Sequence, residues 1–203
     1  MIKHVAVVVG VLLLASVALA QDEGRWDVGL NAVGLWGKQT SGNGTTQIPT
    51  KNIGFLATVR FHIGDRSALE VNWSRGNDSQ KYITSTLQYR VLTTLNEFTG
   101  AYVFRPMQTE RFKPFLLVGG GAIVFNPDNT LIFETPQALE GVRQTRPAVL
   151  YGGGVDYHLV RALSLRLQYR GLFYSPPDFK LPGLLTGGHG HMAEPGVGLV
   201  IKF

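Results

Sequence analysis

The chain has 203 residues, of which 44% are hydrophobic, 25 are glycine and none is cysteine, and its formal net charge is +5. Residues 21–203 contain no apolar run of the roughly 20 residues that a membrane-crossing helix needs, which argues against a helical membrane protein. The net charge is too small to indicate nucleic-acid binding, and attraction to anionic lipid headgroups is its simpler consequence.

The first twenty residues have the pattern of a secretory signal peptide. Lys3 provides a basic start, residues 5–14 are almost entirely apolar, and residues 18–20 (Ala-Leu-Ala) are a small-residue cleavage site. The apolar run is short for a membrane anchor, so cleavage is preferred. The expected organisation is a signal peptide at residues 1–20 and one domain at residues 21–203. An exported domain of this size without cysteines favours a self-closing barrel over a disulfide-stapled sandwich.

In chain order, the domain is a series of short segments in which apolar and polar side chains alternate. A period of two is typical of a β-strand with two unlike faces. It is clearest at residues 52–63, where every second side chain from Ile53 to Ile63 is apolar. The eight expected strands are residues 25–36, 52–63, 67–76, a segment ending near 105, and residues 114–125, 147–159, 162–174 and 193–203. The fourth begins somewhere between Ile83 and Leu92, and the facing of the fifth is ambiguous because both of its faces are apolar or glycine.

The connections between these strands alternate in length, as they do in transmembrane barrels with long outer loops and short periplasmic turns. Long connections are expected at residues 37–51, 126–146 and 175–191, an intermediate one at 77–82, and short ones at 64–66, 106–113 and 160–161. Trp26 and Trp36 bracket about the 9–11 residues that a tilted transmembrane strand requires, so they suit two aromatic girdles. Phe61, Phe104 and Phe203 are expected near the periplasmic rim.

Periodicity alone does not say which face points outward, because soluble ligand-carrying barrels alternate with their apolar face inward. The signal peptide, the loop alternation and the terminal Phe203 favour a membrane barrel with its charged face inward. Charges of nearly balanced sign could pair in a narrow lumen, and eight strands leave an interior that side chains fill. The lumen is therefore expected to be plugged by a polar network, with His62 and His158 nearby. The expected network residues are Asp27, Arg60, Glu70, Glu97, Asp156, Arg166, Arg170, Glu194 and Lys202.

The strand plan and four local sequences resemble the small OmpA/OmpX-type eight-stranded outer-membrane β-barrel family, over nearly all of residues 21–203. The four sequences are VGGG at 118–121, YGGG at 151–154, QYRGLFY at 168–174 and GLVIKF at 198–203. The resemblance implies an all-β, eight-stranded antiparallel up-and-down transmembrane barrel in the bacterial outer membrane, in contact with outer-membrane lipids and lipopolysaccharide, and a monomer. It also implies that the outer-membrane assembly machinery recognises Phe203. The separate peptidoglycan-binding domain of some members is not expected.

No catalytic, metal or cofactor motif emerges from the sequence. The two glycine triplets lack the Gly-Lys-Ser/Thr of a phosphate-binding loop and instead indicate close backbone approach within strands. His189 and His191 provide two imidazoles, with no third metal ligand identifiable beyond Glu194. There is no Gly-x-Ser-x-Gly nucleophile motif.

The expected function is therefore non-enzymatic, in envelope integrity or surface interaction through the outer loops. Loop cations could contact lipopolysaccharide phosphates; they are Lys38, Lys51, Lys81, Arg143, Arg146 and Lys180. Two alternatives stay open. One is an outer-leaflet lipid-modifying enzyme, such as a lipid A deacylase or acyltransferase, in which His189 or His191 would act with Ser175. The other is a narrow channel.

Overall fold

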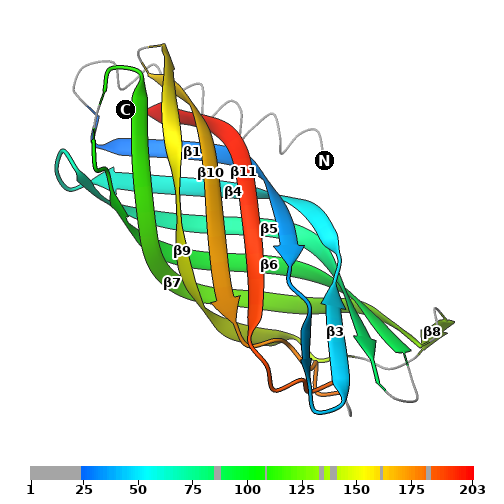
Figure 1. The fold of residues 1–203 in the computed structure, drawn as a ribbon. Helices are drawn as coiled ribbons and strands as arrows, with labels where there is room; N and C mark the ends of the chain where they lie inside the picture. Colours follow the sequence, from blue (N-terminus) through cyan, green and yellow to red (C-terminus); the bar gives the residue numbers. More distant parts are fainter. Residues whose placement is uncertain are drawn as a thin grey trace.

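The computed structural model describes residues 24–84, 88–107, 109–132, 135–137, 141–160, 162–181 and 184–203. Eight long antiparallel strands close into a barrel (Figure 1), because β1 pairs with both β4 and β11 and the ring is completed through β5 and β6. The expected all-β, eight-stranded up-and-down barrel is confirmed. The expected signal peptide at residues 1–20 lies outside the described residues.

The barrel strands are β1 (Trp26–Gly37), β4 (Lys51–His62), β5 (Ser67–Ile83), β6 (Gln88–Phe104), β7 (Phe112–Ile132), β9 (Gln144–Val160), β10 (Leu163–Tyr174) and β11 (Gly190–Lys202). Three short strands lie in the connections, and they are β2 (Thr40–Gly42), β3 (Thr45–Pro49) and β8 (Thr135–Gln137). In the part of the chain that the structure describes, no helix has the length and apolar character needed to cross a membrane. Following the orientation expected from the sequence, the end with the short turns and the C-terminus is called the periplasmic end, and the opposite end the outer end.

The outward faces of the strands form a continuous apolar belt. The period of two places consecutive residues on opposite faces, so Leu199 of β11 is 50% exposed while Val200 is 3% exposed. The belt consists of the outward side chains of residues 26–36, 53–61, 69–73, 98–104, 112–122, 147–159, 163–173 and 193–203. Beyond it, toward the outer end, the outward residues become polar: Lys51, Arg75, Asn96, Asn126, Thr145 and His191. An apolar band bounded in this way is typical of transmembrane barrels.

Aromatic rings mark the periplasmic edge of the belt. The ring centroids of Trp26 and Phe61 lie 4.7 Å apart, and those of Phe112 and Tyr157 lie 5.0 Å apart. Phe203 closes the barrel there, since its backbone N–H donates to Trp26 O at 2.9 Å. The expected placement of Trp26 and Phe61 in a girdle agrees with this arrangement.

Three strands run well beyond the belt at the outer end, which corrects the expected connections. Residues 77–82, expected as a loop, belong to β5, which pairs with β6 up to Ile83 and Gln88. Residues 126–132, expected in a long loop, continue β7 and pair with β6. With β2, β3 and β8 these extensions form an outer sheet, defined as residues 40–49, 76–83, 88–96, 126–132 and 135–137. Figure 1 shows β3 and β8 at the end of the barrel opposite the C-terminus.

The glycine triplets lie where neighbouring strands approach most closely. A Cβ on Gly119 would lie 2.0 Å from Gly100 O, and one on Gly152 would lie 2.3 Å from Tyr169 O. A side chain at either position would therefore push the strands apart. The triplets therefore mark close approach of neighbouring strands, as the sequence indicated.

Candidate functional site

Deep in the periplasmic half of the lumen, four charged side chains form a closed ring of ion pairs, here called the four-charge cluster. Arg60 Nη2 lies 2.7 Å from Glu70 Oε2, and Arg60 Nη1 lies 3.3 Å from Asp156 Oδ2. Arg166 Nε lies 2.6 Å from Asp156 Oδ1, and Arg166 Nη1 lies 3.4 Å from Glu70 Oε2. Each guanidinium thus bridges both carboxylates, and the cluster balances its own charge.

Phe115 of β7 packs against this cluster. Its ring centroid lies 4.4 Å from Cζ of Arg60 and 5.1 Å from Cζ of Arg166, which are cation–π distances. The ring fills the space beside the two guanidinium groups and is itself buried. The sequence missed this contact because it left the facing of the fifth strand ambiguous. Phe115 and Leu117 face the lumen, while Leu116 and Val118 are exposed on the outside.

A second group, here called the three-charge cluster, lies one layer nearer the outer end. Arg170 Nη1 lies 2.9 Å from Glu194 Oε2, and its Nη2 pairs with Glu97 Oε1. Thr99 Oγ1 accepts a hydrogen bond from Arg170 at 3.1 Å and donates to Glu97 at 2.8 Å. All three charged side chains are fully buried. One cation and two carboxylates therefore share a dry site.

The remaining two expected network residues lie at the periplasmic mouth and differ from each other. Asp27 Oδ2 lies 2.7 Å from His62 Nε2, and both side chains are largely buried. Lys202 is exposed at the end of β11 and takes no part in either cluster. It lies outside both ion-pair clusters, so its expected place in the polar network stays a prediction.

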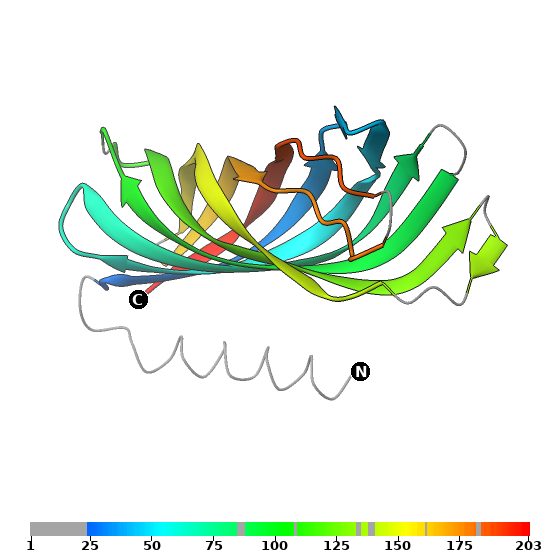
Figure 2. The ribbon, with the colours of Figure 1, turned by 90° about the horizontal axis from the view of Figure 1, so that it is seen from below.

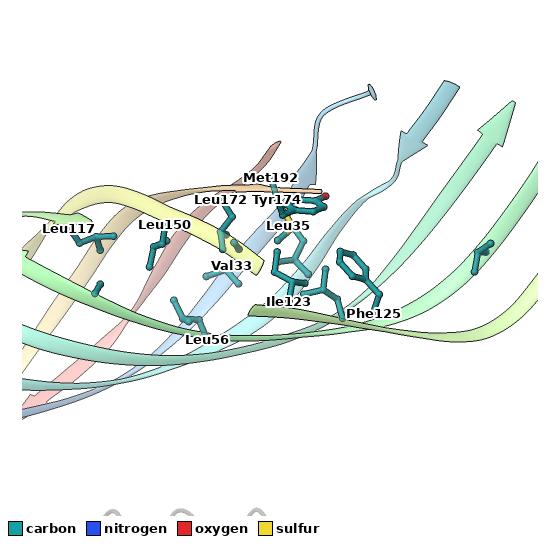
Figure 3. Packing of buried hydrophobic residues seen from close by; sticks show 14 of the residues in the cluster. Val33, Leu35, Leu56, Leu117, Ile123, Phe125, Leu150, Leu172, Tyr174 and Met192 are labelled. Atoms are coloured by element: carbon teal, nitrogen blue, oxygen red, sulfur yellow. The ribbon is translucent and has the colours of Figure 1, made fainter. Parts of the chain in front are cut away.

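The outer half of the lumen is apolar, so polar side chains fill the periplasmic half and apolar ones the outer half. In Figure 3 the labelled apolar side chains point from the strands toward one another inside the barrel. The apolar lumen cluster includes Val33, Leu35, Leu56, Leu95, Ile123, Phe125, Leu150, Leu172, Tyr174 and Met192. These residues are almost completely buried, so this half of the barrel is packed like a protein core.

Residues 175–181 and 184–189, here called the cover segment, close the outer end. Phe179 and Leu184 are fully buried against the apolar lumen cluster, and the Phe179 ring meets Tyr82 edge-on. The Tyr82 hydroxyl donates to Pro177 O at 2.6 Å. The backbone N–H groups of Asp178 and Phe179 both donate to Gln144 Oε1 at 3.0 Å. In Figure 2 the orange segment after β10 lies at this end of the barrel.

Asp178 anchors the cover segment to β9. Its Oδ1 lies 3.3 Å from Arg146 Nη2 and accepts a hydrogen bond from Gln144. Partial burial opposes ionisation, but the hydrogen bonds from Gln144 and the Lys180 N–H and the charge of Arg146 outweigh it, so the pKa of Asp178 is lowered. The anchor is therefore ionised at neutral pH.

A polar network of the outer sheet supports the cover segment from the side. Gln47 Nε2 donates to Gln80 Oε1 at 2.6 Å and to the Tyr82 hydroxyl at 3.2 Å. Asp78 accepts hydrogen bonds from Gln80, from Thr50 Oγ1 at 3.3 Å and from the Ser79 N–H at 2.8 Å. Asp78 lies beyond Trp73, the last belt residue of β5, and burial raises its pKa to about 6 despite these hydrogen bonds.

The histidines considered for chemistry lie on the outside of the barrel. His191 Nε2 lies 2.9 Å from the Tyr151 hydroxyl, and its ring packs 4.8 Å from that of Phe173. His189 and Ser175 are exposed in the cover segment. Within the described ranges, no group of three or more His, Asp or Glu side chains is arranged to hold a metal ion.

The expected loop cations are divided by the structure. Lys51, Lys81 and Arg146 lie in strands, and Arg146 is held by Asp178. Lys51 places its Nζ 5.9 Å from the Trp36 ring centroid at the outer edge of the belt. The exposed cations of the outer end include Lys38, Lys51, Arg143 and Lys180.

No protein-family model matches the sequence, and a search of curated proteins finds no match. Solved structures are similar in fold. Neisserial surface protein A is 15% identical, with 88% of this chain and 97% of that chain covered and a TM-score of 0.57. The outer-membrane protein OprG of Pseudomonas aeruginosa is 14% identical, with 89% and 96% covered and a TM-score of 0.57. Ail of Yersinia pestis is 14% identical, with 89% and 100% covered and a TM-score of 0.51.

At these identities the likeness establishes the fold, and it agrees with the outer-membrane location expected from the sequence. The resemblance to the small eight-stranded outer-membrane barrels is confirmed: this chain has their fold.

Proposed function

We propose that the protein is a non-enzymatic barrel of the bacterial outer membrane, monomeric, which acts through its outer surface and not through its lumen. The observation that carries the proposal is the filling of the lumen along its length. Two buried ion-pair clusters are followed by the apolar lumen cluster and then by the cover segment. A barrel filled in this way leaves the outer sheet and loops as the surface available for interaction.

Conduction would require this filling to be disrupted. A hydrated ion passing the four-charge cluster would have to separate buried partners such as Arg60 and Glu70, which lie 2.7 Å apart. Breaking a buried pair leaves an uncompensated charge and costs about 3–5 kcal/mol. The ion would then meet the apolar lumen cluster, where a charge is not solvated. These two barriers in series argue against a channel.

The outer surface suits an anionic glycan. Lys38, Lys51, Arg143 and Lys180 are exposed there, and ammonium and guanidinium groups form charge-assisted hydrogen bonds with phosphate or sulfate. A structural neighbour of comparable fold, Ail, has been solved in complex with a heparin analogue, sucrose octasulfate (14% identity, TM-score 0.50). We propose lipopolysaccharide phosphates as the corresponding partner here, which would serve surface interaction or envelope integrity.

Two measurements on the refolded barrel test this proposal. Planar-bilayer recording should show no steady conductance for the natural chain. The barrel should bind vesicles that carry lipopolysaccharide more strongly than it binds phosphatidylcholine vesicles. Joint replacement of Lys38, Lys51, Arg143 and Lys180 by Gln should remove that preference. A steady conductance would contradict the plugged lumen, and acyl release from labelled lipopolysaccharide would support the enzyme alternative instead.

A further inference from the structure

The periplasmic mouth of the barrel carries a cluster of cations that neither lumen cluster uses. Arg105 follows β6 directly, Lys113 is the second residue of β7, and Lys202 ends β11. All three continue the inward-facing phase of their strands, since Val103, Phe115 and Val200 are buried inside the barrel. They therefore line the mouth, Arg105 and Lys113 from the neighbouring strands β6 and β7 and Lys202 from β11.

Arg105 is the most informative of the three because it is more than nine-tenths buried, with 8% of its surface exposed. Its backbone N–H donates to Arg66 O at 2.9 Å, which fixes the residue at the rim. Its Nη2 contacts the ring of His62, which belongs to β4, so the side chain reaches past β5 and across the mouth. A histidine ring supplies no negative charge. The Nε of Arg105 has no hydrogen-bond partner among the described residues.

The charges at the mouth do not balance. Lys202 and Arg105 both act on Lys113 across the mouth, opposed by Asp27 and Asp156. Asp156, however, is bound to Arg166 at 2.6 Å in the four-charge cluster, which is already neutral. Among the described side chains that face into the mouth, Asp27 is the carboxylate outside that cluster, and it lies 2.7 Å from His62. Asp65 and Glu110 are exposed in turns at the same end. The inward-facing cations of the mouth thus outnumber the inward-facing carboxylate outside the cluster, next to a buried N–H donor of Arg105 that has no hydrogen-bond partner among the described residues.

We propose that the periplasmic mouth is a binding site for a phosphate-type oxyanion, held by Arg105, Lys113 and Lys202. An oxyanion would accept a hydrogen bond from the Nε–H of Arg105 and would offset the cost of burying the guanidinium charge. The two lysines at the rim, on β7 and β11, would add charge attraction. The same chemistry is offered by a soluble phosphate ester of the periplasm and by the phosphate of an inner-leaflet lipid. This site is independent of the proposed function at the outer surface, which lies at the other end of the barrel.

Calorimetric titration of the refolded barrel in a zwitterionic detergent with inorganic pyrophosphate tests the site. We expect saturable binding of one pyrophosphate per barrel, weakened at least tenfold by Arg105→Gln and by Lys202→Gln. Lys202 is exposed, so its replacement should leave folding intact even where that of Arg105 does not. Arg66→Gln and Arg111→Gln are matched controls, because each removes one exposed cation from a turn at the same end. These two variants should bind as the natural chain does.

Repeating the titration in nanodiscs distinguishes a soluble phosphate ester from a lipid phosphate as the bound anion. Pyrophosphate binding that persists in phosphatidylcholine but is lost in phosphatidylglycerol would show that a lipid phosphate occupies the mouth. Equal binding in both lipids would indicate a soluble ligand. Absence of binding by the natural chain, or equal weakening by Arg66→Gln and Lys202→Gln, would overturn the proposal, because only diffuse surface charge would then be involved. Neither result would bear on glycan binding at the outer surface.

Discussion

Arg166 of β10 forms two hydrogen bonds with the carboxylate of Asp156 of β9. Its Nε donates to Asp156 Oδ1 at 2.6 Å and its Nη2 donates to Oδ2 at 2.9 Å. The two residues are direct partners in the β9–β10 register, so the strand pairing itself aligns the planar guanidinium with the carboxylate. Two parallel hydrogen bonds of this kind are stronger and more specific than a single contact. The pair therefore links the register of the barrel wall to the filling of its lumen.

Replacing Arg166 by Met should destabilise the barrel by about 3–5 kcal/mol, because Asp156 and Glu70 would stay buried with one guanidinium between them. The double variant Arg166→Met with Asp156→Asn leaves the Arg60–Glu70 pair balanced and should recover much of the loss. Urea unfolding in lipid vesicles measures both, with Lys202→Met as a control near zero. A double variant less stable than Arg166→Met alone would contradict this account of the cluster.

Replacing Leu199 by Arg should cost about 2–4 kcal/mol, since its side chain faces the apolar belt near the middle of the span. Ile63→Arg is the matched control, because Ile63 is similarly exposed but lies in the turn after β4, at the periplasmic interface. Its cost should be about 0–1 kcal/mol. Equal and small effects at the two positions would mean that water, not lipid, surrounds the barrel.

The outer sheet should become less stable as the pH rises through the titration of Asp78. Its carboxyl has a pKa of about 6 in the folded chain against an ordinary value of 3.8. Below pH 4 it is protonated whether the sheet is closed or open, so it contributes nothing. Between pH 4 and 6 only the open form ionises, which favours opening by up to roughly 3 kcal/mol. Amide hydrogen exchange of residues 79–83, corrected for intrinsic rates, should report this loss.

Asp78→Asn is the control for that pH dependence, because it keeps the shape of the side chain and removes its titration. In this variant the opening free energy of residues 79–83 should be the same at pH 4.5 and pH 7. A natural chain whose outer sheet opens less at pH 7 than at pH 4.5 would show that the sign of the Asp78 effect is wrong.

Phe203→Ala should impair assembly into the outer membrane more than it impairs the folded barrel. The hydrogen bonds that Phe203 makes with Trp26 come from the backbone and survive the substitution. We expect the variant to refold in detergent, with the usual difference in gel migration before and after boiling, but to accumulate less in cells. Lys202→Gln should assemble normally. Equal accumulation of Phe203→Ala and the natural chain would remove the proposed role of Phe203 as an assembly signal.

The strands and their two faces were accessible from the sequence because a period of two is a local property. From Ile53 to Ile63 the alternation separates the two faces, and the charge of Arg60 then indicates which of them lies inside. Arg105 could have been found in the same way, since it continues the inward phase of Val103. The charges that meet in the lumen were predictable as a group, whereas their division into two clusters depends on the stagger of the strands.

The outer part of the molecule was not predictable from local patterns. Residues 77–82 are polar and lack an apolar face, and they become strand because β6 and β3 satisfy their backbone groups from both sides. The apolar outer lumen was not predicted, because the inward face was assigned from its charged residues and inward apolar residues such as Leu35 and Leu56 carry no charge. The burial of Phe179 depends on contacts with Tyr82 and Gln144, which lie far away in sequence.

The most direct test of the outward apolar face is the accessibility of spin labels along β11, which a chain without cysteine allows at single sites. Nitroxides attached after Val197→Cys and Leu199→Cys should collide often with oxygen, which dissolves in lipid, and rarely with a water-soluble nickel complex. A label after Asn43→Cys, in the exposed β2–β3 turn, should behave in the opposite way. Frequent nickel collisions at Val197 and Leu199 would contradict the membrane barrel described above.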